Sequence, residues 1–426
     1  MKVYIENYGC SANLSNAEII KALLKKENHL LTNNFKEADV IIINTCIVKS
    51  PTEAKMWNRL EFFSSLNKKV IVTGCMPMVY SRKILEKYPD FILLGTKSIS
   101  KINDALKTKK GVFLEEESFE KVNINKIRTN KIINIVQISE GCFGNCSYCI
   151  VKLAKGSLKS FSQENILEDI KKSIKQGCKE IWITSQDNAS YGLDFVDNTE
   201  KKSKLPKLLK EITKIKGDFF VRVGMMNPNN ILPVLDELID VFSSKKIFKF
   251  IHVPVQSGND RILKLMNRNY RVRDFEFIIK SFRKEFPRIS LSTDVICGFP
   301  TETREEFNDT IKLVKRIKPD VLNISKFGIR PYTEASKLKQ LPTQEIKERS
   351  RMLTEVFNKI SLERNKSWVG WKGNALIDEY SEKNKTFIAR NYCYKPIVIT
   401  KKLGKECLGK IINVKIKSFT NSYLIY

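Results

Sequence analysis

Short apolar runs alternate with helical patterns through most of the first 362 residues. Near the N-terminus these runs are VYIENYGC, VIIINTC, VIVTGC and FILLG. Helical patterns lie between them, for example at residues 52–66 and 79–88. Strands that alternate with helices form a parallel sheet with helices on both faces. Residues 1–110 are therefore expected to form a doubly wound parallel sheet, the first unit of an α/β multidomain chain.

The alternation resumes with longer helices over residues 128–362. Helical patterns there include Gln163–Gln176 and Thr303–Ile317. The candidate strands are Ile132–Ser139, Glu180–Ser185, Phe219–Gly224, Phe248–Pro254, Ile289–Ile296 and Val321–Gly328. A complete βα barrel needs eight such units. Six units predict a partial (β/α)6 barrel.

The pattern changes again over residues 364–426. Short alternating runs separated by turn residues predict a small antiparallel β-barrel. This segment carries 13 basic and four acidic residues, interleaved with Trp371, Tyr380, Phe387, Tyr392 and Tyr394. A basic surface with aromatic faces suits RNA; the alternative is that the aromatic rings form the core. The charged residues 111–127 predict a linker containing a short hairpin or strand.

Three cysteines lie close together in the segment EGCFGNCSYC, directly after an apolar run. Cys142, Cys146 and Cys149 form a C-x3-C-x2-C pattern. Three thiolates on one loop can bind three irons of a [4Fe–4S] cluster and leave the fourth iron open. A zinc loop is the alternative, although zinc sites usually pair C-x2-C with a further Cys or His. The chain has only two histidines, His29 and His252. Buried core thiols are the third interpretation.

Three more cysteines stand at the ends of the N-terminal apolar runs: Cys10, Cys46 and Cys75. Doubly wound sheets bind ligands beyond the carboxyl ends of their strands. These thiols are therefore expected to meet at one edge and to hold a second cluster. The nearby Asn13 and Asn44 could donate to cluster sulfur or cap helices, and capping is the default expectation. The other cysteines lack ligand spacing and are expected to be ordinary thiols; they are Cys178, Cys297, Cys393 and Cys407.

Composition narrows the partners and the compartment. Ten cysteines without a secretory signal favour metal or redox chemistry over disulfides. A net charge of +28 favours a polyanionic partner such as nucleic acid. Lysine enrichment in a thermophile is the alternative, but it does not account for the excess over acids. No apolar window is long enough to span a membrane. A cytoplasmic protein without a membrane partner is expected.

The order of these units resembles the radical SAM methylthiotransferase family over nearly the whole chain. A three-cysteine domain, a barrel with C-x3-C-x2-C and a small basic β-barrel similar to a TRAM domain follow one another. The segments EIWITSQDNASYG, FIHVPVQSGND and STDVICGFPTET are most similar to the archaeal and eukaryotic branch. Members of that branch methylthiolate N6-threonylcarbamoyladenosine at tRNA position 37, on carbon 2 of adenine. Other branches act on isopentenyladenosine or on a ribosomal-protein aspartate.

The resemblance implies two [4Fe–4S] clusters and S-adenosylmethionine (SAM) as cofactors. The cluster on Cys142, Cys146 and Cys149 would bind SAM, and the other would present the sulfur. Both open irons must then face one cavity, so the N-terminal sheet is expected to dock over the barrel mouth. The implied partners are the tRNA anticodon stem-loop and an electron donor such as a ferredoxin or flavodoxin. A zinc-containing RNA-binding protein without catalysis is the alternative of another class.

Barrel chemistry sits at the carboxyl ends of the strands, and this position suggests the SAM contacts. The candidates are Ser185, Gln186, Asp187, Arg222, Gln256 and Arg330. The Gly-Gly-Glu of other radical SAM enzymes is absent from SQDNASYG, so the first three follow from position alone. Arg222 and Arg330 have alternative roles, as contacts to RNA phosphate or as ion pairs at the rim. His252 is expected to hydrogen-bond inside the barrel rather than to act as a base.

Overall fold

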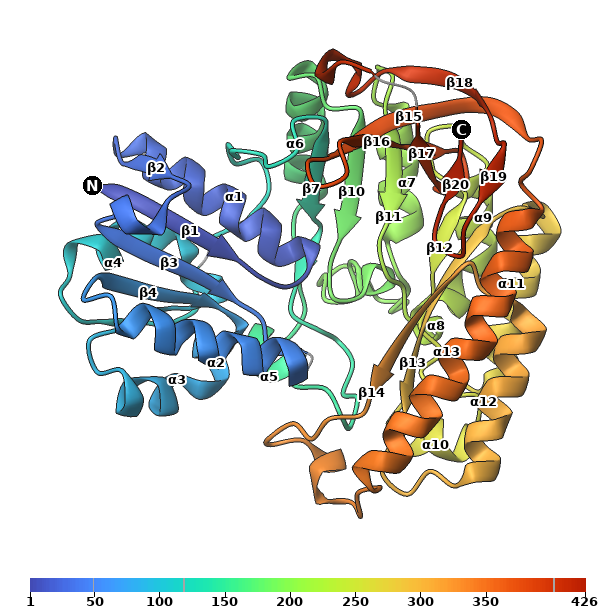
Figure 1. The fold of residues 1–426 in the computed structure, drawn as a ribbon, viewed down its shortest axis with the longest axis horizontal. Coiled ribbons are helices and arrows are strands. Elements are labelled where there is room, and N and C mark those ends of the chain that lie inside the picture. Colours follow the sequence, from blue (N-terminus) through green and yellow to red (C-terminus); the bar gives the residue numbers. More distant parts are fainter. Residues whose placement is uncertain (49, 118, 401–402) are drawn as a thin grey trace.

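A six-stranded parallel sheet forms the N-terminal unit of the computed structural model, which describes residues 1–48, 50–117, 119–400 and 403–426 (Figure 1). The strand order is β2-β1-β3-β4-β5-β6. The strands are β1 (Lys2–Asn7), β2 (Leu30–Thr32), β3 (Val40–Thr45), β4 (Lys69–Gly74), β5 (Ile92–Leu94) and β6 (Val112–Phe113). The neighbouring strands pair in parallel, as the alternating pattern predicted.

Helices cover both faces of this sheet, which confirms the doubly wound arrangement. Helices α1 (Ser11–Lys26) and α4 (Ile102–Lys107) share one apolar core with it. Helices α2 (Ser50–Ser64) and α3 (Cys75–Lys87) share the other. Apolar side chains therefore leave the sheet in both directions, which explains why β3 is buried along its whole length.

The segment predicted as a linker is partly structured. The expected short strand is β6, and it pairs with β5 as the last strand of the N-terminal sheet. Further along, the side chain of Lys121 is fully buried against the barrel. The sheet continues to Phe113, so the boundary at residue 110 is three residues too early, and residues 119–127 pack between two domains.

Six parallel strands form the central partial barrel, and all six were predicted. They are β7 (Ile133–Gln137), β10 (Glu180–Thr184), β11 (Phe220–Val223), β12 (Phe250–His252), β13 (Ser290–Cys297) and β14 (Val321–Lys326). They form two three-stranded sheets, β11-β10-β7 and β12-β13-β14. A parallel bridge between Val221 and Ile247 joins the two sheets. Short apolar strands fit here because helices bury their outer face.

Helices pack on the outside of the barrel (Figure 1). The long ones are α6 (Gln163–Lys175), α7 (Leu205–Lys214), α9 (Leu235–Phe242), α11 (Val272–Glu285), α12 (Arg304–Ile317) and α13 (Thr343–Lys366). The start of α12 is a capping box in which the Thr303 hydroxyl accepts from the Glu306 N–H at 3.3 Å and the Glu306 carboxylate from the Thr303 N–H at 2.8 Å. The shorter elements are α5 (Val151–Lys155), α8 (Pro228–Ile231), α10 (Asp260–Leu265), β8 (Ser139–Glu140) and β9 (Lys159–Ser160).

The C-terminal unit is a curled six-stranded sheet. Its order is β18-β15-β16-β17-β20-β19. The strands are β15 (Lys372–Ser381), β16 (Thr386–Asn391), β17 (Pro396–Ile399), β18 (Ile411–Lys415), β19 (Ser418–Phe419) and β20 (Leu424–Ile425). Strands β18 and β19 are its opposite edges, yet only Ile416 and Lys417 separate them in the chain, so the sheet must curl. The predicted purely antiparallel pairing is wrong for β17 and β20, which pair in parallel.

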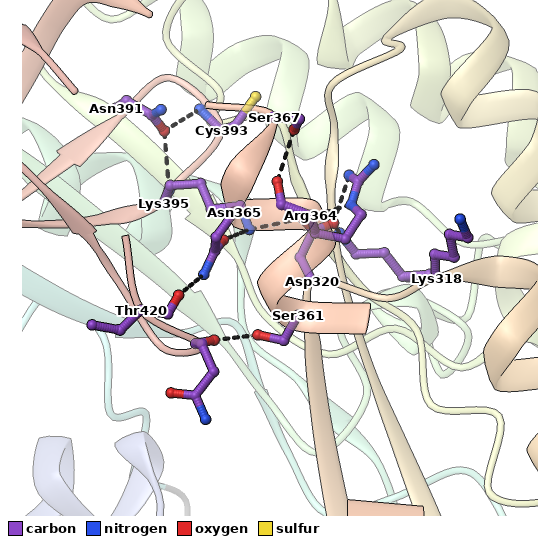
Figure 2. Close-up of polar contacts among 12 residues, drawn as sticks. Lys318, Asp320, Ser361, Arg364, Asn365, Ser367, Asn391, Cys393, Lys395 and Thr420 are labelled. Carbon is purple, nitrogen blue, oxygen red and sulfur yellow. Dashed lines mark hydrogen bonds and ion pairs between the residues drawn. The ribbon is translucent and has the colours of Figure 1, made fainter. Parts of the chain in front are cut away.

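Helix α13 connects the barrel to this sheet, and it continues to Lys366, past the predicted boundary at residue 362. Figure 2 shows the polar contacts at the junction. Asp320, just before β14, accepts from Arg364 at 2.9 Å and from Lys395 at 2.8 Å. Asn365 donates to the Thr420 carbonyl at 2.9 Å. A buried carboxylate with two cations fixes the sheet on the barrel.

The C-terminal sheet lies at the amino ends of the barrel strands, the end away from the cysteine loop (Figure 1). The Tyr394 ring packs against Phe248 and Phe250, with ring centres 4.8 and 5.4 Å apart. Arg390 bonds to Asp378 at 3.0 Å beside it. Phe387 is buried and Tyr394 is half-buried, as in the alternative interpretation of the aromatic residues, whereas Tyr392 is exposed. Together these side chains close the floor of the barrel.

Among the described residues, none of the helices combines the length and apolar character needed to cross a bilayer.

Candidate metal centre

The three N-terminal cysteines follow three adjacent strands. Cys10 comes after β1, Cys46 directly after β3, and Cys75 directly after β4. The register pairs Asn44 of β3 with Asn7 and with Thr73, so the three strand ends lie level. The strand order reverses between β1 and β3, and doubly wound sheets bind ligands at this point. The structure thus brings Cys10, Cys46 and Cys75 to one edge, as the sequence predicted.

Two glycines make this close arrangement sterically possible. Gly9 has φ +105°, and a Cβ there would lie 2.8 Å from the Cys46 Cβ. Gly74 has φ +90°, and a Cβ there would lie 2.4 Å from the Thr45 carbonyl oxygen. Both conformations and both distances exclude a larger residue. Each glycine directly precedes a cysteine of the set and so fixes where that thiol lies.

The predicted helix-capping role of Asn13 and Asn44 is wrong. Cys10 is the N-cap of α1, without a side-chain hydrogen bond. Asn13 instead donates to the Tyr8 and Thr45 carbonyls at 2.8 and 2.9 Å. Asn44 donates to the Asn13 carbonyl at 2.8 Å. The two amides therefore tie the loops after β1 and β3 together, because buried backbone carbonyls need donors there.

The second cysteine set lies on the loop between β8 and α5. The Cys142 N–H donates to the Gly156 carbonyl at 3.1 Å, and the Cys149 N–H donates to the Cys146 carbonyl at 3.1 Å. Ser147 anchors the loop to the barrel through its hydroxyl, 2.6 Å from the Leu265 carbonyl. Cys142, Cys146 and Cys149 are thus held together at the barrel mouth, as their spacing predicted.

A half-buried cation contacts this loop. Arg268 donates to the Cys146 sulfur at 3.2 Å and to the Asn227 side chain at 3.2 Å. It follows α10 and is far from the cysteines in sequence, so no local pattern identified it. A guanidinium beside a thiol stabilises negative charge on the sulfur. Arg268 is therefore suited to an anionic group bound at Cys146.

Burial keeps several of these thiols protonated in the absence of metal. It raises the pKa of Cys142 to about 11 and that of Cys149 to about 12, with the neighbouring Cys146 adding to the shift. Burial likewise raises the pKa of Cys75 to about 12. Metals bind thiolates, so loading either set must release protons.

No three His, Cys, Asp or Glu side chains are arranged to hold one metal ion anywhere in the described residues. A single zinc ion requires four ligands that converge on one point.

A buried charge cluster separates the two cysteine sets. Glu140, two residues before Cys142, accepts from Lys121 at 2.7 Å and from Lys155 at 3.3 Å. Burial alone lowers the pKa of Lys155, but Glu140, Cys75 and Cys10 outweigh it and raise that pKa above its usual value. Lys155 therefore remains a cation facing the N-terminal thiols. A lysine just after the cysteine loop gave no sequence signal, because most lysines are exposed.

The N-terminal sheet docks on the barrel mouth, as expected. The Ser11 hydroxyl, next to Cys10, lies 2.9 Å from the Thr184 hydroxyl at the end of β10. Gln137 at the end of β7 donates to Asn16 of α1 at 2.9 Å. Helix α5, which follows Cys149, packs against α3, which begins at Cys75. The carboxyl edge of the sheet and the carboxyl ends of the barrel strands therefore face each other.

Three of the predicted SAM contacts follow β10 at this mouth. Asp187 is buried and accepts from the Asn227 N–H at 2.9 Å and from the Asn230 amide at 2.7 Å. Burial raises its pKa to about 6. Ser185 and Gln186 each have a buried side-chain oxygen without a hydrogen-bond partner. Asp187 thus braces the loop, while its two neighbours retain bonding capacity for a ligand.

Gln256 lies four residues after β12 and forms an isolated parallel bridge with Val295 of β13. Its φ is +69°, and its N–H donates to the Asp294 carbonyl at 2.8 Å. His252 lies four residues before Gln256, and its Nε2 atom is 3.0 Å from the Asp294 carboxylate. The expected hydrogen bond of His252 inside the barrel is confirmed.

The structure places both candidate arginines away from Ser185. Arg222 lies among the rings of Trp182, Phe250 and Tyr394, 5.1–5.3 Å from their centres. Arg330 bonds to the Glu53 carboxylate at 2.5 Å and to the Val48 carbonyl at 2.9 Å. The first contributes to the barrel floor, and the second joins the barrel to the N-terminal unit.

All ten cysteines are free. The four that lack ligand spacing are separate from both sets; Cys178, Cys297 and Cys393 are buried in apolar cores and Cys407 is half-buried.

Two family models match the chain. Residues 136–314 match the Radical SAM superfamily, and residues 2–95 match the Uncharacterized protein family UPF0004. These matches coincide with the partial barrel and with the N-terminal sheet. Each therefore contains one of the two cysteine sets.

Full-length relatives are also similar. The chain is 41% identical to the probable threonylcarbamoyladenosine tRNA methylthiotransferase of Pyrococcus horikoshii, over 100% of this chain and 99% of that protein. It is 33% identical to the threonylcarbamoyladenosine tRNA methylthiotransferase of Homo sapiens, over 97% of this chain and 72% of that protein.

Solved structures share the fold. The radical S-adenosylmethionine methyltransferase TsrM from Kitasatospora setae aligns with a TM-score of 0.57 at 12% identity, over 79% of this chain and 77% of that chain. The cobalamin-dependent S-adenosylmethionine radical enzyme OxsB aligns with a TM-score of 0.54 at 12% identity, over 84% of this chain and 55% of that chain. Combined with the full-length identities, these matches show that the chain belongs to the threonylcarbamoyladenosine tRNA methylthiotransferase family of the radical SAM superfamily.

Proposed function

We propose that this chain is a tRNA methylthiotransferase that attaches a methylthio group to carbon 2 of N6-threonylcarbamoyladenosine at tRNA position 37. The observation that carries the proposal is the opposition of two three-cysteine sets across the junction of the sheet and the barrel. The full-length similarity to relatives of that name supports it.

Each cysteine set is proposed to hold one [4Fe–4S] cluster and to leave one iron open. The donor chemistry fits, because each set has three thiols and a nearby cation: the half-buried Arg268 beside Cys146, and the buried Lys155 facing Cys75 and Cys10. These cations offset the negative charge of a thiolate-bound cluster. The two histidines are not beside either set; His252 bonds to Asp294, and His29 lies beside the amino terminus.

SAM is proposed to bind at the barrel mouth, where Ser185, Gln186 and Gln256 contact it. The unpartnered oxygens of Ser185 and Gln186 support this position. Asp187 holds the same loop in place through Asn227 and Asn230. When bound, a reduced cluster and SAM supply one-electron chemistry, which can remove a hydrogen atom from an aromatic carbon that no side-chain base can ionise.

The protein's own residues have three tasks in this scheme. Arg268 and Lys155 stabilise charge at the two cysteine sets. Ser11, Gln137 and Arg330 fix the sheet on the barrel, so that the two sets stay at constant separation. The docked sheet also restricts water at the mouth, which protects radical chemistry from side reactions.

The C-terminal sheet is proposed to be a TRAM-like RNA-binding unit that contacts the tRNA anticodon stem-loop. Its exposed lysines support this role; they are Lys372, Lys383, Lys385, Lys410, Lys415 and Lys417. Position 37 lies in a single-stranded loop, where a base is displaced at little cost. We further propose that the enzyme acts in the cytoplasm and takes electrons from a ferredoxin or flavodoxin.

Nucleoside analysis tests the proposed function. Anaerobically reconstituted protein is incubated with SAM, a reductant and tRNA that carries N6-threonylcarbamoyladenosine. The expected result is a mass gain of one methylthio group on nucleoside 37. Cys146→Ala should abolish the gain, whereas Cys407→Ala, outside both sets, should retain it. A gain on isopentenyladenosine tRNA instead, or on a ribosomal-protein aspartate, would reassign the substrate.

Metal analysis separates catalysis from the zinc alternative. Two four-iron clusters give about eight irons per chain. Protein prepared without oxygen that contains zinc and little iron would contradict the proposal.

A further inference from the structure

Tyr332 has an unusual environment for an aromatic residue. Its side chain is 77% exposed, and its backbone has φ +64°. This left-handed conformation favours glycine and is rare for bulky residues. The exposed ring gains little burial that would offset the strain. Neither the backbone nor the packing of the protein alone explains a tyrosine at this position.

The segment around Tyr332 is firmly anchored despite its exposure. Arg330 ties it to Glu53 and Val48 of the N-terminal unit. The Thr333 hydroxyl donates to the Arg330 carbonyl at 2.7 Å. The Ala335 N–H donates to the Ser147 carbonyl at 2.8 Å, and Ser147 lies between Cys146 and Cys149. The backbone that carries Tyr332 is therefore held close to the cysteine loop and to the N-terminal unit.

Other exposed apolar side chains come from two loops that carry cysteines and from the segment of Tyr332 itself. Val48 follows Cys46 by two residues, Phe143 follows Cys142 directly, and Ile329 precedes Arg330. With Tyr332, these residues form what we call the apolar rim of the barrel mouth. The Arg330 bond to the Val48 carbonyl joins the parts of the rim that come from the two domains.

Exposed cations flank the same segment. Lys326 lies at the end of β14 and Lys339 follows Tyr332 by seven residues, whereas Lys337, which lies between Tyr332 and Lys339, pairs with Glu334 at 2.9 Å. Aromatic faces next to cations suit unpaired nucleotides, whose bases stack and whose phosphates are neutralised. The net charge of +28 favours a polyanionic partner such as RNA over a protein partner whose surface carries few acidic residues.

We propose that the Tyr332 ring stacks on the unpaired base beside the target adenosine in the tRNA anticodon loop. The target base must pass the apolar rim to approach the cysteines. The adjacent base in the loop is then the one that contacts the rim. Stacking there would hold the loop with one base directed into the mouth and so help to select position 37. This inference rests on the proposed function.

The test uses anticodon stem-loop RNA in which 2-aminopurine replaces the base beside position 37. Stacking quenches the fluorescence of 2-aminopurine. The fluorescence of the bound RNA should therefore be quenched by the unchanged enzyme and by Tyr332→Phe, which keeps an aromatic ring. Tyr332→Gly removes the ring and also relieves the backbone. It should weaken binding roughly tenfold and restore fluorescence in the remaining complex. Its unfolding midpoint should equal or exceed that of the unchanged enzyme.

Phe277→Ala is the matched control, because Phe277 is an exposed ring (57%) on α11, on the outer side of the barrel. It should leave binding and quenching unchanged. Tyr332→Gly that binds and quenches like the unchanged enzyme would overturn the inference and leave the proposed function intact. A lower unfolding midpoint for both Tyr332→Gly and Tyr332→Ala would also overturn it, since the ring would then be structural. An unchanged enzyme that neither binds the RNA nor methylthiolates tRNA would refute the proposed function itself.

Discussion

Arg330 and Glu53 form an ion pair with a 2.5 Å contact that joins the segment after β14 to helix α2. They are far apart in sequence and belong to different domains. Both are largely buried, and Arg330 also donates to the Val48 carbonyl. The pair therefore determines how the N-terminal sheet is seated over the barrel.

Removal of this arginine should loosen the domain interface. Arg330→Ala leaves a buried carboxylate without its partner, and the expected loss of stability is about 2–3 kcal/mol. Urea unfolding measures the loss, and limited proteolysis should show faster cleavage between the domains. Arg304→Ala breaks an exposed pair with Glu348 and should change stability by at most about 0.5 kcal/mol. Equal effects of the two changes would show that Arg330 does not hold the interface.

The two cysteine sets should fail in different ways. Alanine at Cys142, Cys146 and Cys149 should abolish SAM cleavage, because those thiols are proposed to hold the SAM-binding cluster. Alanine at Cys10, Cys46 and Cys75 should spare SAM cleavage but stop sulfur insertion. Each triple variant should retain about four irons. Iron analysis and detection of cleaved SAM are the measurements; loss of cleavage in both variants would refute this division of labour.

Two lysines on α5 allow the charge at each cysteine set to be changed separately. Lys155 faces Cys75 and Cys10, whereas Lys152 is a neighbour whose charge lowers the pKa of Cys142. A nearby cation stabilises the reduced, more negative cluster. Lys155→Met should therefore lower the reduction potential of the N-terminal cluster by on the order of tens of millivolts, and Lys152→Met that of the other cluster.

Redox titration followed by electron paramagnetic resonance measures both potentials. Lys155→Arg keeps the charge and should keep the potential. A shift of the same cluster by both methionine variants would contradict the assignment of one lysine to each set.

Glu180 should make stability depend on pH. It lies at the barrel floor beside Asp378, and burial together with that neighbour raises its pKa to about 8. The folded protein therefore keeps a proton that the unfolded chain releases near the ordinary value of 4.5. Stability should fall as the pH rises from about 4.5 to about 8, by up to about 1.4 kcal/mol per pH unit.

Glu180→Gln should remove this contribution, since the amide stays neutral throughout. Urea midpoints near pH 6 and near pH 8 measure the difference. Glu164→Gln, an exposed carboxylate on α6, is the control and should behave like the unchanged protein. Burial also raises the pKa of Asp187 to about 6, so a smaller pH dependence should remain; one of unchanged size in Glu180→Gln would assign the effect to other groups.

The strands and the two cysteine sets could be predicted because they depend on local patterns. Val40–Thr45 is recognisable as a short, nearly continuous apolar run because the strand is buried on both faces, and Cys46 follows at a strand end where parallel sheets bind their ligands. The spacing of Cys142, Cys146 and Cys149 needs no tertiary information at all.

The residues that the sequence analysis missed act through contacts between distant segments. Lys121 and Lys155 are buried only because Glu140 lies between them, and an isolated lysine predicts exposure. The positions of Arg222 and Arg330 depend on Tyr394 and Glu53 from other domains. The parallel pairing of β17 with β20 depends on the last two-residue strand of the chain, which is too short to carry a pattern.

The way in which Tyr394 and Arg390 fill the amino ends of the barrel strands has a practical consequence for truncation experiments. A chain cut after α13 would lose this stopper and expose Phe248, Phe250 and Glu180 to solvent. Inactivity of such a fragment would then reflect water entry at the amino ends of the barrel strands, and not the loss of an RNA-binding surface. To separate barrel closure from RNA binding, the exposed lysines of the C-terminal sheet must be substituted one at a time while Tyr394 and Arg390 are kept.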